Sequence, residues 1–199
     1  NFDIAAVHEA FTQTIEDNQS PASGDILAVV PKPGKVRPTS CSDIAWTSAY
    51  PRLVAMQYQY YGNTRTLESR WSSLVRYQEN LIANASTQGI AVCDTYGDWY
   101  CGNENSCCTD QNAPDCPVKS EMGGFNYVLG LQAMAQIAVI LGKNDAAVRY
   151  SGLASTATGV FHSRFYNTSV ARYGGDMGAI QSLSLPALKI TSPPAQIYP

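Results

Sequence analysis

The sequence is poor in charged residues. Only 15% of its 199 residues are Asp, Glu, Lys or Arg, compared with about a quarter in typical globular domains. The net charge is −3 and no basic stripe is present, which argues against a nucleic-acid partner. The apolar runs are too short and too often interrupted to span a membrane. The chain begins at Asn1 without a signal or transit peptide, so we expect any targeting segment to have been removed or to lie upstream.

The signatures of the commonest enzyme classes are also missing. The sequence has no G-x-S-x-G, no phosphate-binding loop and no H-E-x-x-H. Its two histidines, His8 and His162, are isolated on helical stretches, and we interpret both as structural or surface residues. We therefore expect no metal and no cofactor. The apolar fraction of 45% is nevertheless enough for a sizeable core.

The cysteines and glycosylation sequons favour an oxidising compartment. Of the six cysteines, Cys41 stands apart and the others crowd into one loop: Cys93, Cys101, Cys107, Cys108 and Cys116. A thiolate metal site is the alternative, but the paired C-x-x-C spacing and a nearby histidine are lacking. The pairing stays open, because six cysteines allow about 15 connectivities. Sequons at Asn18, Asn84 and Asn167 agree with a secreted glycoprotein.

The hydrophobic periodicity predicts an all-α chain. Helices are expected over 2–16, 45–60, 64–83, 122–141 and 144–163, with a sixth opening near Asp176. Pro51 predicts either a kink in the second helix or a start near Tyr50. The connections 61–63 and 142–143 are tight, whereas 17–42, 85–121 and 164–175 are long.

The helices alternate in character as well. The second and fourth are apolar nearly all round, whereas the first, third and fifth carry one apolar stripe, which on the first comprises Ile4, Val7, Phe11 and Ile15. A helix apolar all round is buried on every side. Both alternations predict two concentric rings, with the long loops gathered at one mouth where the inner helices begin. The alternative is a helical solenoid, but solenoid repeats are shorter and have uniformly short loops. We expect about half of an (α/α)6 barrel over 1–188, followed by a Pro-rich tail, 189–199.

Residues that suit sugar recognition lie in or beside the long loops. Asp43 and Trp46 stand where an inner helix starts, and Tyr96, Asp98 and Trp99 lie within a loop. An indole face stacks on the apolar face of a pyranose, and a carboxylate accepts hydrogen bonds from its hydroxyls. The alternatives are a core position for Trp46 and a turn role for Asp98.

Other side chains are less informative. The helical spacing of Trp71 predicts a packing residue. Glycosidases use two carboxylic groups, but the spacing pairs none of the candidates, so no catalytic residue is assigned. These candidates are Asp25, Asp43, Asp94, Asp98, Glu104, Asp110, Asp115 and Glu121.

An ordered set of short stretches carries a family resemblance. They are 24–26 with 29–31, 43–46 through 49–51, 60–63, Gly97-Asp98-Trp99, and 135–138 through 141–143. Over about residues 1–188 the chain resembles the six-hairpin catalytic domain of α-L-rhamnosidases, glycoside hydrolase family seventy-eight. The tail from about Lys189 and the cysteine-rich insertion at about 101–118 depart from that pattern.

The resemblance implies an (α/α)6 barrel and inverting hydrolysis of terminal α-L-rhamnose from a rhamnose-containing glycoside or polysaccharide. It places the general acid before residue 1 and the general base after residue 199, so the remainder of the barrel is an expected partner. It carries over Trp46 and Trp99, with Asp98, as an aromatic wall of the rhamnose subsite. The alternatives are a barrel glycosidase for another sugar and a non-catalytic carbohydrate-binding protein.

The six cysteines should be oxidised, because they are even in number and five crowd into one polar loop. Thiol titration of the denatured, unreduced protein from a secreting host is expected to find few free thiols. Four or more free thiols would contradict the prediction.

Overall fold

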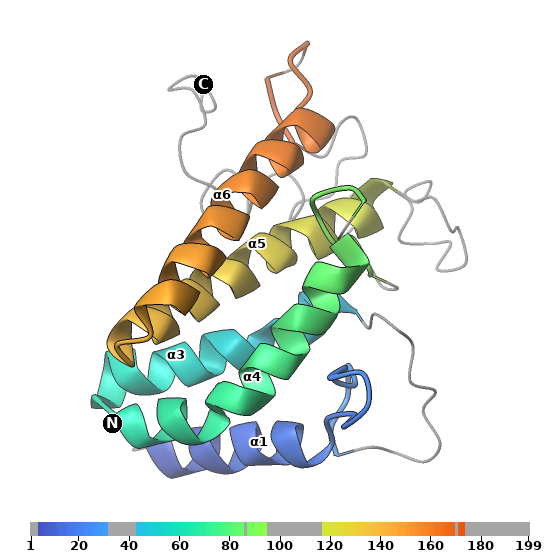
Figure 1. Cartoon of the computed structure of the whole chain (residues 1–199). Coiled ribbons are helices and arrows are strands. Elements are labelled where there is room, and N and C mark those ends of the chain that lie inside the picture. Colours follow the sequence, from blue (N-terminus) through green and yellow to red (C-terminus); the bar gives the residue numbers. More distant parts are fainter. Residues whose placement is uncertain (1–3, 32–42, 86, 95–116, 170, 174–199) are drawn as a thin grey trace.

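The computed structural model describes residues 4–31, 43–85, 87–94, 117–169 and 171–173 (Figure 1). The helices within these ranges are α1 (Ala5–Asp17), α2 (Ile44–Thr47), α3 (Ala49–Tyr61), α4 (Thr64–Ala85), α5 (Pro117–Ile140) and α6 (Asn144–Phe165). The described residues form no strand beyond an isolated antiparallel bridge between Asn167 and Arg172. The predicted all-α class is confirmed.

The predicted helix 45–60 is two helices. It divides at Ser48, so that α2 is a single turn and α3 continues to Tyr61. Pro51 lies in the first turn of α3, where a missing backbone N–H breaks no hydrogen bond within the helix. The start near Tyr50 is therefore correct. The predicted helix near Asp176 and the tail 189–199 lie outside the described residues.

The helices form two layers. Each of the hairpins α3–α4 and α5–α6 contributes one helix to the inner layer and one to the outer layer. Helices α3 and α5 pack against each other and against α4; α1 packs on α3 and α4, and α6 packs on α5. The turns that join α3 to α4 and α5 to α6 lie at the same end of the molecule (Figure 1). Gly62 and Gly142 adopt left-handed backbone angles there, with φ of 64° and 66°, which favours glycine. The arrangement is that of a six-hairpin barrel fragment, with α3 and α5 inside.

Helix α5 is the core of the structure. Residues 121–128 are all buried, and they are followed by buried Leu131, Met134 and Ile137. By length and composition alone the segment Lys119–Ile140 is apolar enough to cross a membrane, but 67% of it is buried inside the fold. The neighbouring helices therefore cover most of its surface, as predicted for an inner helix, whereas Val139 near its C-terminal end is exposed.

The apolar stripe of α6 is buried, whereas that of α1 is largely exposed. On α6 the buried residues recur at helical spacing through Ala147, Tyr150, Ala154, Ala157 and Phe161, as expected for an outer helix. On α1 the expected stripe is wrong in part. Ile15 is buried, but Ile4, Val7 and Phe11 are exposed, because α1 meets the inner layer with Thr12 and Ile15 instead.

Polar contacts join the two outer helices α4 and α6. Arg149 on α6 forms an ion pair with Glu79 on α4, and the Tyr150 hydroxyl donates to the same carboxylate at 3.1 Å. The hydrogen bond from Arg149 is the main cause that lowers the pKa of Glu79. Trp71 meets Tyr150 edge-on, with ring centroids 6.4 Å apart. Trp71 therefore packs between helices, in keeping with its predicted structural role.

At Gly123 the connection that follows α4 comes close to α5, through the backbone of Val92. A Cβ at this position would lie 2.7 Å from the backbone carbon of Val92, whereas a Cβ at Gly152 on α6 meets nothing within 4 Å. We expect Gly123→Ala to destabilise the protein by about 1–3 kcal/mol, since the backbone must shift to accept the methyl group. The matched control Gly152→Ala should stabilise it by up to about 1 kcal/mol through helix propensity. Denaturant unfolding measures both, and equal effects of the two substitutions would contradict the packing described.

Candidate functional site

The start of α2 lies beside the first half of α5 and beside the connection that follows α4. The backbone N–H of Ile44, the first residue of α2, donates to the Cys93 carbonyl at 3.0 Å. The Ser48 hydroxyl donates to Asn126 Oδ1 on α5 at 3.2 Å. These two contacts bring the connection after α4 and the first half of α5 to the start of α2. The described parts of these connections thus meet where the mouth was predicted.

Trp46 is the most prominent aromatic residue of this region. It lies on α2 and is 44% exposed, whereas Ile44, Thr47 and Ser48 around it are buried. The alternative that Trp46 is a core residue is therefore wrong. Asp43 immediately precedes α2, and its carbonyl accepts the backbone N–H groups of Trp46 and Thr47 at 3.1 and 2.9 Å. An accessible indole and a carboxylate-bearing residue thus stand at the start of an inner helix.

The other predicted sugar-binding residues, Tyr96, Asp98 and Trp99, lie outside the described residues, so their proximity to Trp46 stays a prediction. Of the six cysteines, only Cys93 belongs to the described part of the chain, and it is disulfide-bonded.

Sequence reasoning missed the polar side chains that hold α2. Thr47 Oγ1 lies 2.8 Å from the hydroxyl of Tyr77 on α4, and both residues are buried. Burial raises the pKa of Tyr77 far above its usual range, so this hydroxyl keeps its proton. In the sequence, Tyr77 follows Leu74 and precedes Leu81 at helical spacing, and this pattern does not distinguish it from an ordinary core residue.

Two buried carboxyl groups, those of Asp25 and Glu121, lie near this end of the fold. Burial is the main cause that raises the pKa of Tyr77. The hydrogen bond with Thr47 lowers this pKa, and the charge of Asp25 raises it. Burial, followed by Tyr166 and Glu121, raises the pKa of Tyr173 to about 12. Among the described residues no three His, Cys, Asp or Glu side chains gather as a metal site would require.

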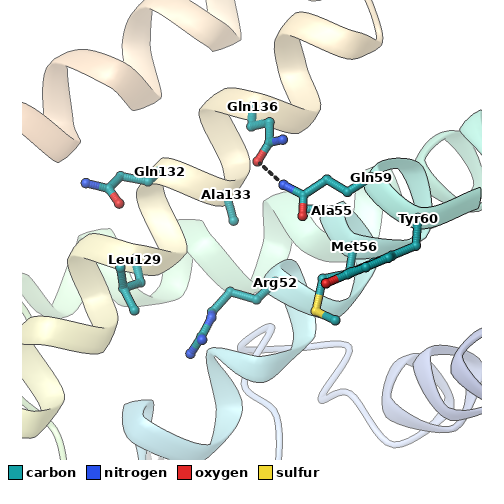
Figure 2. A pocket seen from close by; sticks show the side chains of 9 residues that line it. All are labelled: Arg52, Ala55, Met56, Gln59, Tyr60, Leu129, Gln132, Ala133 and Gln136. Carbon is teal, nitrogen blue, oxygen red and sulfur yellow. Dashed lines mark hydrogen bonds between the residues drawn. The ribbon is translucent and has the colours of Figure 1, made fainter. Parts of the chain in front are cut away.

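A concavity lies farther along the inner helices, away from Trp46. It is a groove of about 350 Å³ between α3 and α5, lined by Arg52, Ala55, Met56, Gln59, Tyr60, Leu129, Gln132, Ala133 and Gln136 (Figure 2). Gln59 donates to Gln136 across it at 3.3 Å. Arg52 is the charged side chain of the lining. Amides and a guanidinium form hydrogen bonds but supply no carboxylic acid–base pair, so this lining by itself does not suit glycoside hydrolysis.

The chain matches known proteins over nearly its full length. Residues 1–194 match the family described as the bacterial alpha-L-rhamnosidase 6 hairpin glycosidase domain. The structure is similar to that of the alpha-L-rhamnosidase from Dictyoglumus thermophilum, with a TM-score of 0.79 and 25% identity over 96% of this chain. No curated protein sequence matches the chain.

A second solved structure has the same fold. It is the Streptomyces avermitilis alpha-L-rhamnosidase complexed with L-rhamnose, with a TM-score of 0.60 and 19% identity over 83% of this chain. The chain spans 20% of the length of the Dictyoglumus protein and 16% of the Streptomyces protein.

Proposed function

The chain belongs to the bacterial α-L-rhamnosidase six-hairpin glycosidase family, and from this membership we propose that the protein containing it hydrolyses the bond to a terminal α-L-rhamnose residue. The observation that carries the proposal is the family match over 1–194 together with the fold shared with a rhamnosidase at 25% identity. The substrate class is a rhamnose-containing glycoside or polysaccharide.

The remainder of the same barrel is the partner that this chain needs. In this chain the outer helix α1 leaves Ile4, Val7 and Phe11 exposed. Val139 on α5 and Val148 on α6 are exposed as well. Burying apolar area gains about 25 cal/mol per Å², so further hairpins packed on these helices stabilise the closed ring.

The reaction is inverting hydrolysis. One carboxylic acid protonates the departing glycosidic oxygen, and one carboxylate activates a water molecule on the opposite face of the sugar. We expect both groups in parts of the protein other than this chain, as the family resemblance implies. The role of the present residues is to bind and orient the rhamnose.

Trp46 and Asp43 form one side of the rhamnose site, completed by Tyr96, Asp98 and Trp99. The exposure of Trp46 at the start of an inner helix supports this assignment. Its indole stacks on the apolar face of the sugar, and the carboxylates accept hydrogen bonds from the hydroxyl groups. The aromatic side chains thus hold the glycosidic bond in place for the acid and the base.

The protein is secreted, disulfide-bonded and glycosylated in this proposal. The disulfide at Cys93 supports an oxidising compartment. Of the three sequon residues, Asn84 is exposed on the last turn of α4, where a glycan has room.

Replacing the stacking residues should weaken transition-state binding. In the full-length enzyme, Trp46→Ala and Trp99→Ala should each cost about 1–3 kcal/mol in kcat/KM on an aryl α-L-rhamnoside, since a large aromatic contact is lost. Trp71→Phe, which keeps an aromatic ring in a packing position away from the mouth, serves as the control and should leave kcat/KM unchanged. Wild-type kcat/KM in both alanine variants would remove these residues from the site.

Residues 1–199 alone should not hydrolyse an aryl α-L-rhamnoside. Inverting hydrolysis requires an acid and a base, and the proposal places both elsewhere in the protein. The assay compares this segment with the full-length enzyme at equal concentration, with circular dichroism to establish that the segment is helical. Comparable turnover by the two proteins would show that carboxylates within 1–199 form the catalytic pair.

A further inference from the structure

We propose that Tyr77 and Asn126 are positioning residues, which fix α2 so that Trp46 is presented to the sugar in one orientation. This inference rests on the proposed function, because the value of a fixed indole lies in binding rhamnose. Neither residue reaches the mouth with its own side chain: Tyr77 and Asn126 are both buried. They act through Thr47 and Ser48, the two residues that follow Trp46.

Helix α2 needs support from outside. It is a single turn of four residues, Ile44–Thr47, and a turn of this length is unstable alone because nucleation costs more than its few hydrogen bonds return. The Asp43 side chain makes no capping hydrogen bond to its first turn. The conformation of α2 therefore depends on contacts with other elements.

The first contact is a chain of hydroxyl groups from α4. Thr47 Oγ1 donates to the Asp43 carbonyl at 3.0 Å. A threonine hydroxyl has a single proton, so the Tyr77 hydroxyl, 2.8 Å away, is the donor to Thr47 Oγ1. The chain Tyr77–Thr47–Asp43 thus closes the turn that carries Trp46. The raised pKa of Tyr77 keeps this donor protonated throughout the physiological range.

The second contact comes from α5. The Ser48 hydroxyl donates to Asn126 Oδ1 at 3.2 Å, and Asn126 Nδ2 donates to the Met122 carbonyl at 2.9 Å. The bond to Met122 fixes which amide atom faces Ser48. On the other side of Trp46, the Ile44 N–H is bonded to Cys93. Helix α2 is therefore held on both sides of its exposed indole, by three separate elements.

Loss of either side-chain contact should loosen the indole without removing it. A stacking ring that must be ordered on binding lowers affinity, because its freedom is lost at that moment. A contact made equally in the ground and transition states changes KM more than kcat. The expected signature is therefore a raised KM with an almost unchanged kcat.

The test compares Tyr77→Phe and Ser48→Ala with Tyr50→Phe in the full-length enzyme. Tyr50 is a matched control, because its buried hydroxyl also meets a hydroxyl on α4, that of Ser73 at 2.9 Å, but makes no contact with α2 through this group. We expect Tyr77→Phe and Ser48→Ala to raise KM for an aryl α-L-rhamnoside about three- to tenfold, the range for one lost hydrogen bond. Tyr50→Phe should lower Tm similarly and leave KM unchanged. Thr47→Ser, which keeps the hydroxyl, should retain the wild-type KM.

A second readout does not depend on the substrate. In protein labelled with 5-fluorotryptophan, the ¹⁹F resonance of Trp46 is assigned by its absence in Trp46→Phe. It should broaden or divide in Tyr77→Phe and Ser48→Ala and stay single in Tyr50→Phe. If the wild-type enzyme does not cleave the rhamnoside, the proposed function fails, and the resonance still decides whether these residues hold Trp46. The same resonance and KM in Tyr77→Phe as in Tyr50→Phe would overturn the proposal.

Discussion

Helix α5 buries its polar residues Lys119, Glu121 and Asn126 together with its apolar ones, and a helix of this kind is stable in water only if other elements cover it. Residues 121–128 are all buried, with α3, α4 and α6 packed around the helix. The absence of a side chain at Gly123 lets the backbone of Val92 come close to α5. The burial of this one helix thus sets the positions of the helices around it and of one connection.

Helices α3 and α5 run in the same direction within one layer, and the start of α3 lies beside the first half of α5 (Figure 1). There the structure adds directed polar contacts, such as that between Ser48 and Asn126, to the apolar packing of Ile44 and Tyr50. Hydrogen bonds between buried side chains depend on geometry more than apolar contacts do. The region around Trp46 is therefore held by hydrogen bonds as well as by apolar packing. This combination suits a site that orients a sugar on a rigid scaffold.

The sequence predicted the helices well, because their signals are local. The stripe on α6 and the glycines that end α3 and α5 depend on near neighbours in the chain, and Pro51 marked the start of α3. The orientation of α1 was not predictable, because its apolar stripe is exposed at Val7 and Phe11 and the helix packs on its neighbours through another face. The contact between Ser48 and Asn126 joins residues 78 positions apart, and no local pattern indicates such a pair.

We propose that rhamnose binds beside Trp46, at the start of α2, and not in the amide-lined groove between α3 and α5. The most direct measurement is a crystal structure of the full-length enzyme with L-rhamnose bound. We expect a rhamnose ring stacked on the Trp46 indole, within reach of Asp43. A sugar bound instead between Arg52 and Gln132, with no sugar contact to Trp46, would contradict it.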